Sequence, residues 1–141
     1  MTSPSASPAA PFRRSRFIAI SRLMFGRIWL RVGMTAQLDV RGRRTGAPHR
    51  TVLLPVDVGG TTYLLSQYGV SEWVRNLRAA GLGELRRKGR VASFTAVEVD
   101  GAERDRVIAT FHAKAPKPFR ADYEQRPDPA DHPTFRVDPI V

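Results

Sequence analysis

The sequence predicts an α+β fold: a small barrel of mostly antiparallel strands with helices packed on its outside. Three observations support this fold class. The chain of 141 residues can bury one hydrophobic core and hardly a second. Several short segments alternate apolar and polar residues with a period of two, and short turn signals join them. Segments of helical period lie before, between and after these strands, where they can cover a sheet.

The N-terminal 33 residues carry two different patterns. Residues 1–11 are almost entirely Ser, Pro and Ala and predict a disordered tail. Residues 12–33 place apolar side chains such as Phe17, Ile20, Met24 and Ile28 at steps of three and four. They predict a basic amphipathic helix, interrupted too often by Arg to span a bilayer. This helix either packs on the domain of residues 34–141 or lies on an anionic membrane surface.

Three strands are expected next, at residues 36–41, 49–58 and 61–66, because the apolar period changes to two. A loop rich in Gly and Arg, residues 42–48, joins the first two. Gly59 and Gly60 form a two-residue hairpin signal before the third. Pro55 lies inside the second strand and cannot donate a ladder hydrogen bond, so it predicts a sheet edge or a bulge.

The second half of the chain predicts further helices and strands. Ser71 is a suitable N-cap for a helix that runs to about residue 80. Trp73, Asn76 and Leu77 share one face of it, and a buried Asn76 amide needs hydrogen-bond partners. We expect strands at 85–88 and 91–99 and a helix at 103–114 whose inward residues are Val107, Ile108 and Phe111. The proline-rich residues 116–133 predict a loop with one short helical turn near 119–124, and residues 134–137 a closing strand.

The charge of the chain indicates an anionic partner. Lys and Arg number 23 against 13 Asp and Glu, which gives a net charge of +10. Such a field attracts nucleic acid, an anionic membrane surface, or a phosphorylated or polyacidic small molecule. The chain has no cysteine, which excludes disulfides, thiolate catalysis, zinc–thiolate sites and iron–sulfur clusters. The three histidines show no metal-ligand spacing, so no metal site is expected, and we expect His112 and His132 at the surface or in loops.

The loop around residues 41–50 is the richest local signal. Gly42 and Gly46 allow tight backbone geometry and close approach of an anion to main-chain N–H groups. Arg43 and Arg44 supply planar donor forks, and Thr45 supplies a hydroxyl. The pattern matches neither the nucleotide-binding P-loop nor the dinucleotide-binding glycine fingerprint. From the residues alone it predicts either a general anion-binding loop or a solvated basic turn.

Three stretches of the chain carry a resemblance to a known family. They are Gly-Arg-Arg-Thr-Gly at 42–46 followed by Pro48, Leu-Leu-Ser-Gln-Tyr-Gly at 64–69, and Glu-Trp-Val-Arg-Asn-Leu at 72–77. In this order and spacing the segment resembles the deazaflavin-dependent (coenzyme F420-dependent) nitroreductase family. The resemblance implies a split β-barrel of the FMN-binding type. It also implies an oxidoreductase that passes a hydride from the reduced deazaflavin to an electron-poor small molecule, such as a nitroaromatic, a quinone or an activated enone.

The resemblance also implies roles for individual residues. The anionic tail of F420, a phosphate followed by glutamates, would be gripped by Arg43, Arg44 and Arg50. Thr45 and Gly46 would meet its phosphate. The remaining expected coenzyme-binding residues would line the ring or hold the helix that closes the site, with Asn76 hydrogen-bonded to the coenzyme: Ser66, Gln67, Trp73 and Asn76.

Two positions need separate comment. His49, which is also expected to contact the coenzyme, follows Pro48 where the family usually has Arg, so Arg50 would replace that Arg only in part. Tyr68 is the one residue of its segment that can hydrogen-bond a substrate or give it a proton, so it is the candidate catalytic donor; the alternative is a packing or polar-lining role. No metal and no catalytic triad are implied, because the coenzyme supplies the chemistry and the protein supplies orientation.

Alternative functions remain open at this stage. FMN is the second choice of coenzyme, since it also ends in a phosphate but lacks the glutamate tail. A split barrel can instead carry a lipid-like or tetrapyrrole ligand without turning it over. A basic nucleic-acid-binding module is the third alternative, but Phe94 stands alone where a stacking platform needs several aromatics, so no nucleic acid is expected. We expect a cytoplasmic protein, either free or peripheral on the membrane through residues 12–33, and by analogy a homodimer.

Overall fold

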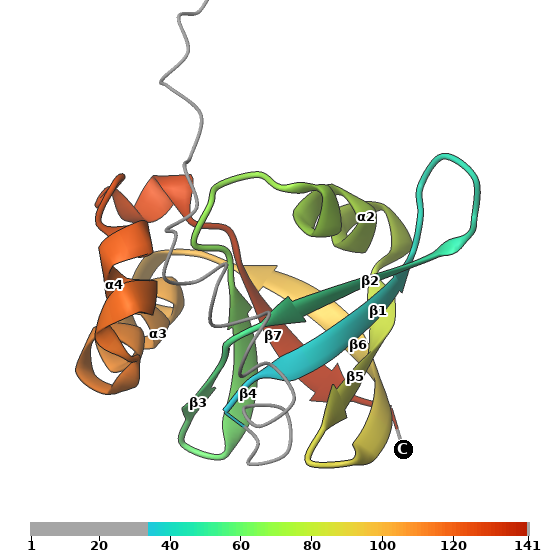
Figure 1. The fold of residues 1–141 in the computed structure, drawn as a ribbon, viewed down its shortest axis with the longest axis horizontal. Helices are drawn as coiled ribbons and strands as arrows, with labels where there is room; N and C mark the ends of the chain where they lie inside the picture. Colours follow the sequence, from blue (N-terminus) through green and yellow to red (C-terminus); the bar gives the residue numbers. More distant parts are fainter. Residues whose placement is uncertain (1–33, 141) are drawn as a thin grey trace, which may run out of the picture.

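The computed structural model describes residues 34–140 (Figure 1). The predictions of a tail at 1–11 and a basic helix at 12–33 lie outside these described residues. Within them the chain forms one seven-stranded sheet in the order β2-β1-β5-β6-β7-β4-β3, with every neighbouring pair antiparallel. The strands are β1 (Ala36–Arg41), β2 (Pro48–Leu53), β3 (Pro55–Val58), β4 (Thr61–Leu65), β5 (Leu82–Arg87), β6 (Arg90–Val99) and β7 (Thr134–Pro139). The curled sheet with its helices is a split barrel, as predicted.

The barrel curls because one long segment supplies both edges of the sheet. The strand expected at 49–58 is divided at Leu54 into β2 and β3. Strand β2 pairs with β1, whereas β3 pairs with β4 at the opposite end of the strand order. Pro55 begins β3, an edge strand, which confirms the prediction from its missing N–H. The chain thus crosses from one edge of the sheet to the other (Figure 1).

The last strand lies in the middle of the sheet. Strand β7 pairs with β6 through Phe94–Val99 and with β4 through Thr62–Leu65. The predicted closing strand is therefore confirmed, and its position explains why its inward side chain Phe135 is buried. Within the described residues the C-terminal strand is required to join the two halves of the barrel.

The helices cover two hydrophobic cores, one on each face of the sheet. Helix α2 (Glu72–Ala80) covers the inner face of the sheet, where its Val74 and Leu77 pack on Leu38 and Phe135. Helices α3 (Gly101–Lys114) and α4 (Lys117–Tyr123) pack together on the other face, against β3, β4 and the end of β6. The residues predicted to point inward from α3 do so: Val107, Ile108 and Phe111.

Apart from shifts of one or two residues at other ends, two elements differ from the prediction. Strand β5 begins at Leu82 instead of residue 85, because Gly83 continues the strand. A Cβ at Gly83 would lie 3.0 Å from the Asp39 carbonyl oxygen, so glycine permits the close pairing with β1. Helix α4, seven residues long, replaces the single expected turn in the proline-rich stretch. No helix within residues 34–140 combines the length and apolar character needed to cross a bilayer.

Candidate functional site

The loop between β1 and β2 forms a tight hairpin that extends from the sheet beside α2 (Figure 1). The Gly42 N–H donates to the Ala47 carbonyl over 2.7 Å, and the Gly46 N–H to the Gly42 carbonyl over 2.9 Å. Gly46 has a φ of +78°, a conformation that other residues adopt only with strain. The Thr45 hydroxyl accepts a bond of 3.2 Å from the Ala47 N–H. The glycines of the motif therefore set the shape of the loop, and Thr45 stabilises its turn.

His49 packs against Gly42 at the base of this loop. A Cβ on Gly42 would come within 2.6 Å of the His49 ring, so any other residue there would require the ring to move. His49 thus contacts the loop backbone directly. Gly42 itself is buried, whereas His49 is exposed.

Asn76 fastens the loop to α2. Its Oδ1 accepts one hydrogen bond from the Arg43 N–H over 3.2 Å and another from the Arg43 guanidinium over 2.8 Å. The same guanidinium donates to Glu72 over 3.0 Å, and this bond holds the pKa of Glu72 below its ordinary value. Asn76 is only 2% exposed, so the paired bonds bury its polar group without leaving Oδ1 unsatisfied. We call this network the Arg43–Asn76 clamp.

The clamp leaves the other two arginines of the predicted cradle in different situations. Arg44 is exposed and makes no hydrogen bond or ion pair with any residue from 34 to 140. Arg50 pairs with Asp39 over 2.8 Å, directly across the β1–β2 ladder. Because alternate strand residues point to opposite faces, Arg50 lies on the face opposite the buried Val40, away from α2. The structure therefore brings Arg43 to α2, leaves the Arg44 guanidinium open to a ligand, and directs Arg50 elsewhere.

The segment from Ser66 to Ser71 forms the second wall of the site, between β4 and α2. The Ser66 hydroxyl donates to the Gly69 carbonyl, which closes a tight turn, and the Ser66 N–H donates to the Pro133 carbonyl over 2.9 Å. Its carbonyl lies 2.8 Å from Nδ1 of His132. Ser66 therefore positions the segment through three bonds within the protein.

Two buried polar atoms in this wall have no partner in the described protein. They are Oε1 of Gln67 and Oγ of Ser71. Both residues line a cavity of about 30 Å³, and Trp73 and Tyr68 border the same space. A buried polar atom left without a hydrogen bond is costly, so these two atoms mark a place that suits a hydrogen-bonding ligand or water. Ser71 is the N-cap residue as predicted, but its side chain makes no capping bond.

Tyr68 has a partner that the sequence did not indicate. Its hydroxyl donates to Oδ2 of Asp122 in α4 over 2.8 Å, and Asp122 is 1% exposed. The bond joins the site wall to the helix layer, across 54 residues of chain. A proton donated from Tyr68 to a substrate would have to leave this bond.

His132 was expected at the surface or in a loop: it does lie in the short loop before β7, but it is not at the surface. It is completely buried, stacked on the ring of Tyr123 at 3.8 Å, and both ring nitrogens face backbone carbonyls, those of Ser66 and Arg126. The proline-rich stretch folds back on β4 through this contact, which periodicity could not reveal. Within residues 34–140 no three His, Asp or Glu side chains gather as a metal site would require.

Comparisons with known proteins agree with this geometry. A family model described as F420H(2)-dependent quinone reductase matches residues 17–131. No curated protein matches the chain significantly. Solved structures match at low identity and so show the fold alone.

Three of these structures illustrate the range of proteins that share the fold. An F420-H2-dependent reductase, FDR-A, is 22% identical with a TM-score of 0.60, covering 74% of this chain and 94% of its own. A structure described as a domain-swapped dimer is 21% identical, with a TM-score of 0.59 and coverage of 86% and 98%. The heme storage protein HutZ from Vibrio cholerae is 16% identical, with a TM-score of 0.59 and 92% coverage of each chain.

Proposed function

The chain belongs to the F420H2-dependent quinone reductase family, and on that premise we propose that it binds coenzyme F420 and reduces an electron-poor small molecule. Quinones are the first substrate class to test, with nitroaromatics and activated enones next. The observation that carries the proposal is the pair of unpartnered buried atoms, Gln67 Oε1 and Ser71 Oγ, beside Trp73.

The residues present fit a flavin-like ring. Such a ring has an edge on which an N–H lies between two carbonyl groups. A Gln side chain offers one acceptor and two donors, and a Ser hydroxyl offers both, so the pair can satisfy that edge. Trp73 is half-buried next to them and can cover the face of a planar ring. Binding the ring would satisfy atoms that the described protein leaves unsatisfied.

The residues also fit an anionic tail. Arg44 lies in the loop that the Arg43–Asn76 clamp holds against α2. Its guanidinium makes no bond with residues 34–140, so it can bind a ligand. Its planar guanidinium can bind a phosphate or a carboxylate through two parallel hydrogen bonds. Arg43 contributes differently in this proposal: it fixes the loop instead of gripping the tail. Arg50 would reach the tail only by leaving Asp39, so we assign it a secondary part.

The protein's own groups would orient the reactants and exclude water. The bound coenzyme supplies the hydride, as in other coenzyme-dependent reductases. Loop 66–71, tied down by Ser66 and His132, holds Gln67 in place for the ring. Tyr68 stands at the same wall and can hold a substrate oxygen or give it a proton, with Asp122 accepting the hydroxyl's hydrogen bond in the resting state.

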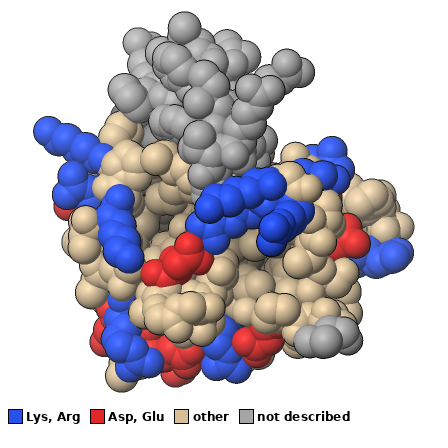
Figure 2. Space-filling view, turned by 90° about the horizontal axis from the view of Figure 1, so that it is seen from below, with Lys and Arg blue, Asp and Glu red and all other residues tan. Residues whose placement is uncertain are grey.

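Two alternatives use the same fold. FMN has a related tricyclic ring but a shorter anionic end, so it would gain less from Arg44. A ligand carrier without catalysis is the other alternative, since the fold also occurs in a heme storage protein. On the face in Figure 2, Lys and Arg are interspersed with Asp and Glu, so this face of the described residues carries no continuous basic track for nucleic acid.

Assembly and location stay predictions for this chain. A structural relative forms a domain-swapped dimer, and we propose a homodimer here, testable by light scattering. A cytoplasmic location, with or without membrane attachment through residues 12–33, is likewise a proposal.

Turnover assays test the function. Purified full-length protein is mixed with reduced F420 and menadione, and the return of oxidised coenzyme absorbance is followed. We expect protein-dependent oxidation that saturates in both reactants. A protein that binds haem stoichiometrically but leaves reduced F420 untouched, with quinone, nitroaromatic and enone alike, would be a carrier and would overturn the proposal.

A further inference from the structure

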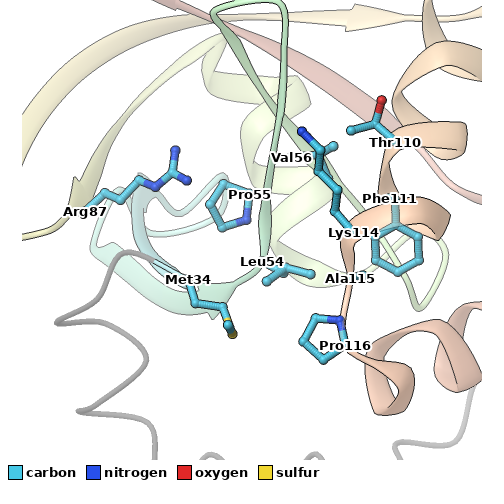
Figure 3. Close-up of a pocket in the computed structure, with 10 residues that line it drawn as sticks. All are labelled: Met34, Leu54, Pro55, Val56, Arg87, Thr110, Phe111, Lys114, Ala115 and Pro116. Atoms are coloured by element: carbon cyan, nitrogen blue, oxygen red, sulfur yellow. The ribbon is translucent and has the colours of Figure 1, made fainter.

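A second pocket lies outside the coenzyme site, between the β2–β3 bend, the end of β5 and the C-terminal end of α3. Its volume is about 160 Å³. Figure 3 shows its apolar floor, formed by Leu54 and Pro55 from the β2–β3 bend and by Phe111 and Pro116 from the α3 end. Leu54 also borders the small cavity beside Gln67, so the two spaces are neighbours.

The polar groups of this pocket come from two elements on opposite sides of it. Figure 3 shows Arg87 from β5 on one side of Pro55 and Val56, and Lys114 and Thr110 from α3 on the other. Arg87 is already engaged, since it donates two hydrogen bonds of 2.9 and 2.7 Å to Asp57. Lys114 makes no hydrogen bond or ion pair with residues 34–140. The lining is therefore amphipathic, with an apolar floor and a cationic rim.

The charges at the rim define the charge of the occupant. Arg87 and Lys114 are two cations, and Asp57 is one carboxylate, so one positive charge remains. The hydrogen bond from Arg87 lowers the pKa of Asp57, and the field of Lys114 adds to this effect, so Asp57 stays ionised near neutral pH. A monoanion would balance this rim, whereas a dianionic phosphate would leave a negative charge unbalanced.

The volume defines the size of the occupant. An apolar cavity of about 150 Å³ in a protein can hold a benzene molecule. A pocket of this size therefore accepts one aromatic ring or about six aliphatic carbons.

We propose that this pocket binds a small monocarboxylate whose apolar part is about the size of a benzene ring. The apolar part would lie on Leu54, Phe111 and Pro116, and the carboxylate would face Lys114. This site is independent of the coenzyme and of the proposed reductase activity.

Nuclear magnetic resonance on the full-length, ¹⁵N-labelled protein tests the proposal with hexanoate as the probe. We expect saturable shifts in the amide signals of Thr110, Phe111 and Ala115. Uncharged 1-hexanol, of equal length, should shift them much less. Lys114→Glu should weaken hexanoate binding on the order of ten-fold or more, because it replaces an attraction by a repulsion. Lys117→Glu makes the same charge change outside the pocket and should leave the affinity within about two-fold.

Three results would overturn the proposal. They are no saturable shift with hexanoate, equal binding of 1-hexanol, or equal weakening by both Lys variants. The dispersion of the ¹⁵N spectrum of each variant serves as the folding control, which does not depend on the proposed activity. A failure of hexanoate binding in a well-folded protein would refute this pocket alone and would leave the proposed reductase activity untouched.

Discussion

Replacing Asn76 by alanine removes the acceptor that holds the β1–β2 loop against α2. Two hydrogen bonds end on its Oδ1, from the Arg43 N–H at 3.2 Å and from the Arg43 guanidinium at 2.8 Å. A bond from a neutral group contributes about 0.5–1.5 kcal/mol, and a bond from a charged group about 1.5–3 kcal/mol. The side chain is 2% exposed, so water cannot easily replace the lost partner. We expect a loss of unfolding free energy of about 2–4 kcal/mol.

Urea denaturation followed by tryptophan fluorescence measures this loss, with the slope against urea checked for two-state behaviour. Glu72→Gln is the matched control, because it removes the other partner of the same guanidinium. The Glu72 side chain is 69% exposed, so its ion pair should contribute less than about 1 kcal/mol. Asn76→Asp keeps an acceptor at the same place and should retain more stability than Asn76→Ala.

The same variants separate stability from binding. If the clamp positions Arg44 for the coenzyme tail, Asn76→Ala should weaken F420 binding even at temperatures where the variant is fully folded. An unfolding free energy within about 0.5 kcal/mol of the wild type would refute the clamp, since distant surface changes have effects of that size. Unchanged coenzyme affinity in a destabilised variant would refute only its positioning role.

The remaining predictions concern single contacts. Arg44→Ala should weaken F420 binding by about 1–3 kcal/mol without changing the melting temperature, because Arg44 makes no hydrogen bond within the described protein; equal affinity would remove it from the site. Gln67→Leu should stabilise the free protein, since it replaces an unsatisfied buried amide, but should weaken coenzyme binding, and calorimetry and titration test the two effects separately. The hydrogen bond from Arg87 lowers the pKa of Asp57 in the folded protein. The ionised Asp57 therefore stabilises the fold above the pKa of an unfolded Asp, about 4, and this stabilisation is lost as the pH falls through the lowered pKa of the folded protein. Asp57→Asn should flatten the fall of unfolding free energy with acid in that range, by less than about 1 kcal/mol because the carboxylate is half exposed; an unaltered slope would show that the pair does not contribute.

Local patterns predicted most of the strands and helices because these elements depend on neighbouring residues. The two-residue period identified β1 and β4, and Gly59-Gly60 identified the hairpin between β3 and β4. Pro55 indicated an edge strand, but the division of the expected strand at Leu54 was not predicted. The start of β5 was missed because Gly83 and Gly81 resemble helix-ending residues. Only the close contact of Gly83 with β1 explains why a glycine belongs in the strand.

The sequence predicted which segments form the site, but not the hydrogen bonds between them. The loop, the turn and the helix were each recognised, yet the bond between Arg43 and Asn76 joins residues 33 apart in sequence. No periodicity encodes such a contact. The sequence did indicate that Asn76 needs partners, and the structure provides Arg43 as one of them. The sequence also did not show that the buried Ser71 hydroxyl lacks a hydrogen-bond partner. The contact of His132 with the Ser66 carbonyl could not be predicted either, because it forms only when the proline-rich stretch folds back on β4.

Equilibrium titration of the full-length protein with oxidised F420 and, separately, with FMN tests the central claim most directly, with the coenzyme fluorescence as the signal. The account predicts saturable binding of F420 that is at least about ten-fold tighter than that of FMN and that loses this advantage in Arg44→Ala. A folded protein that leaves F420 free at every concentration, or that binds both coenzymes equally and ignores Arg44→Ala, would contradict it.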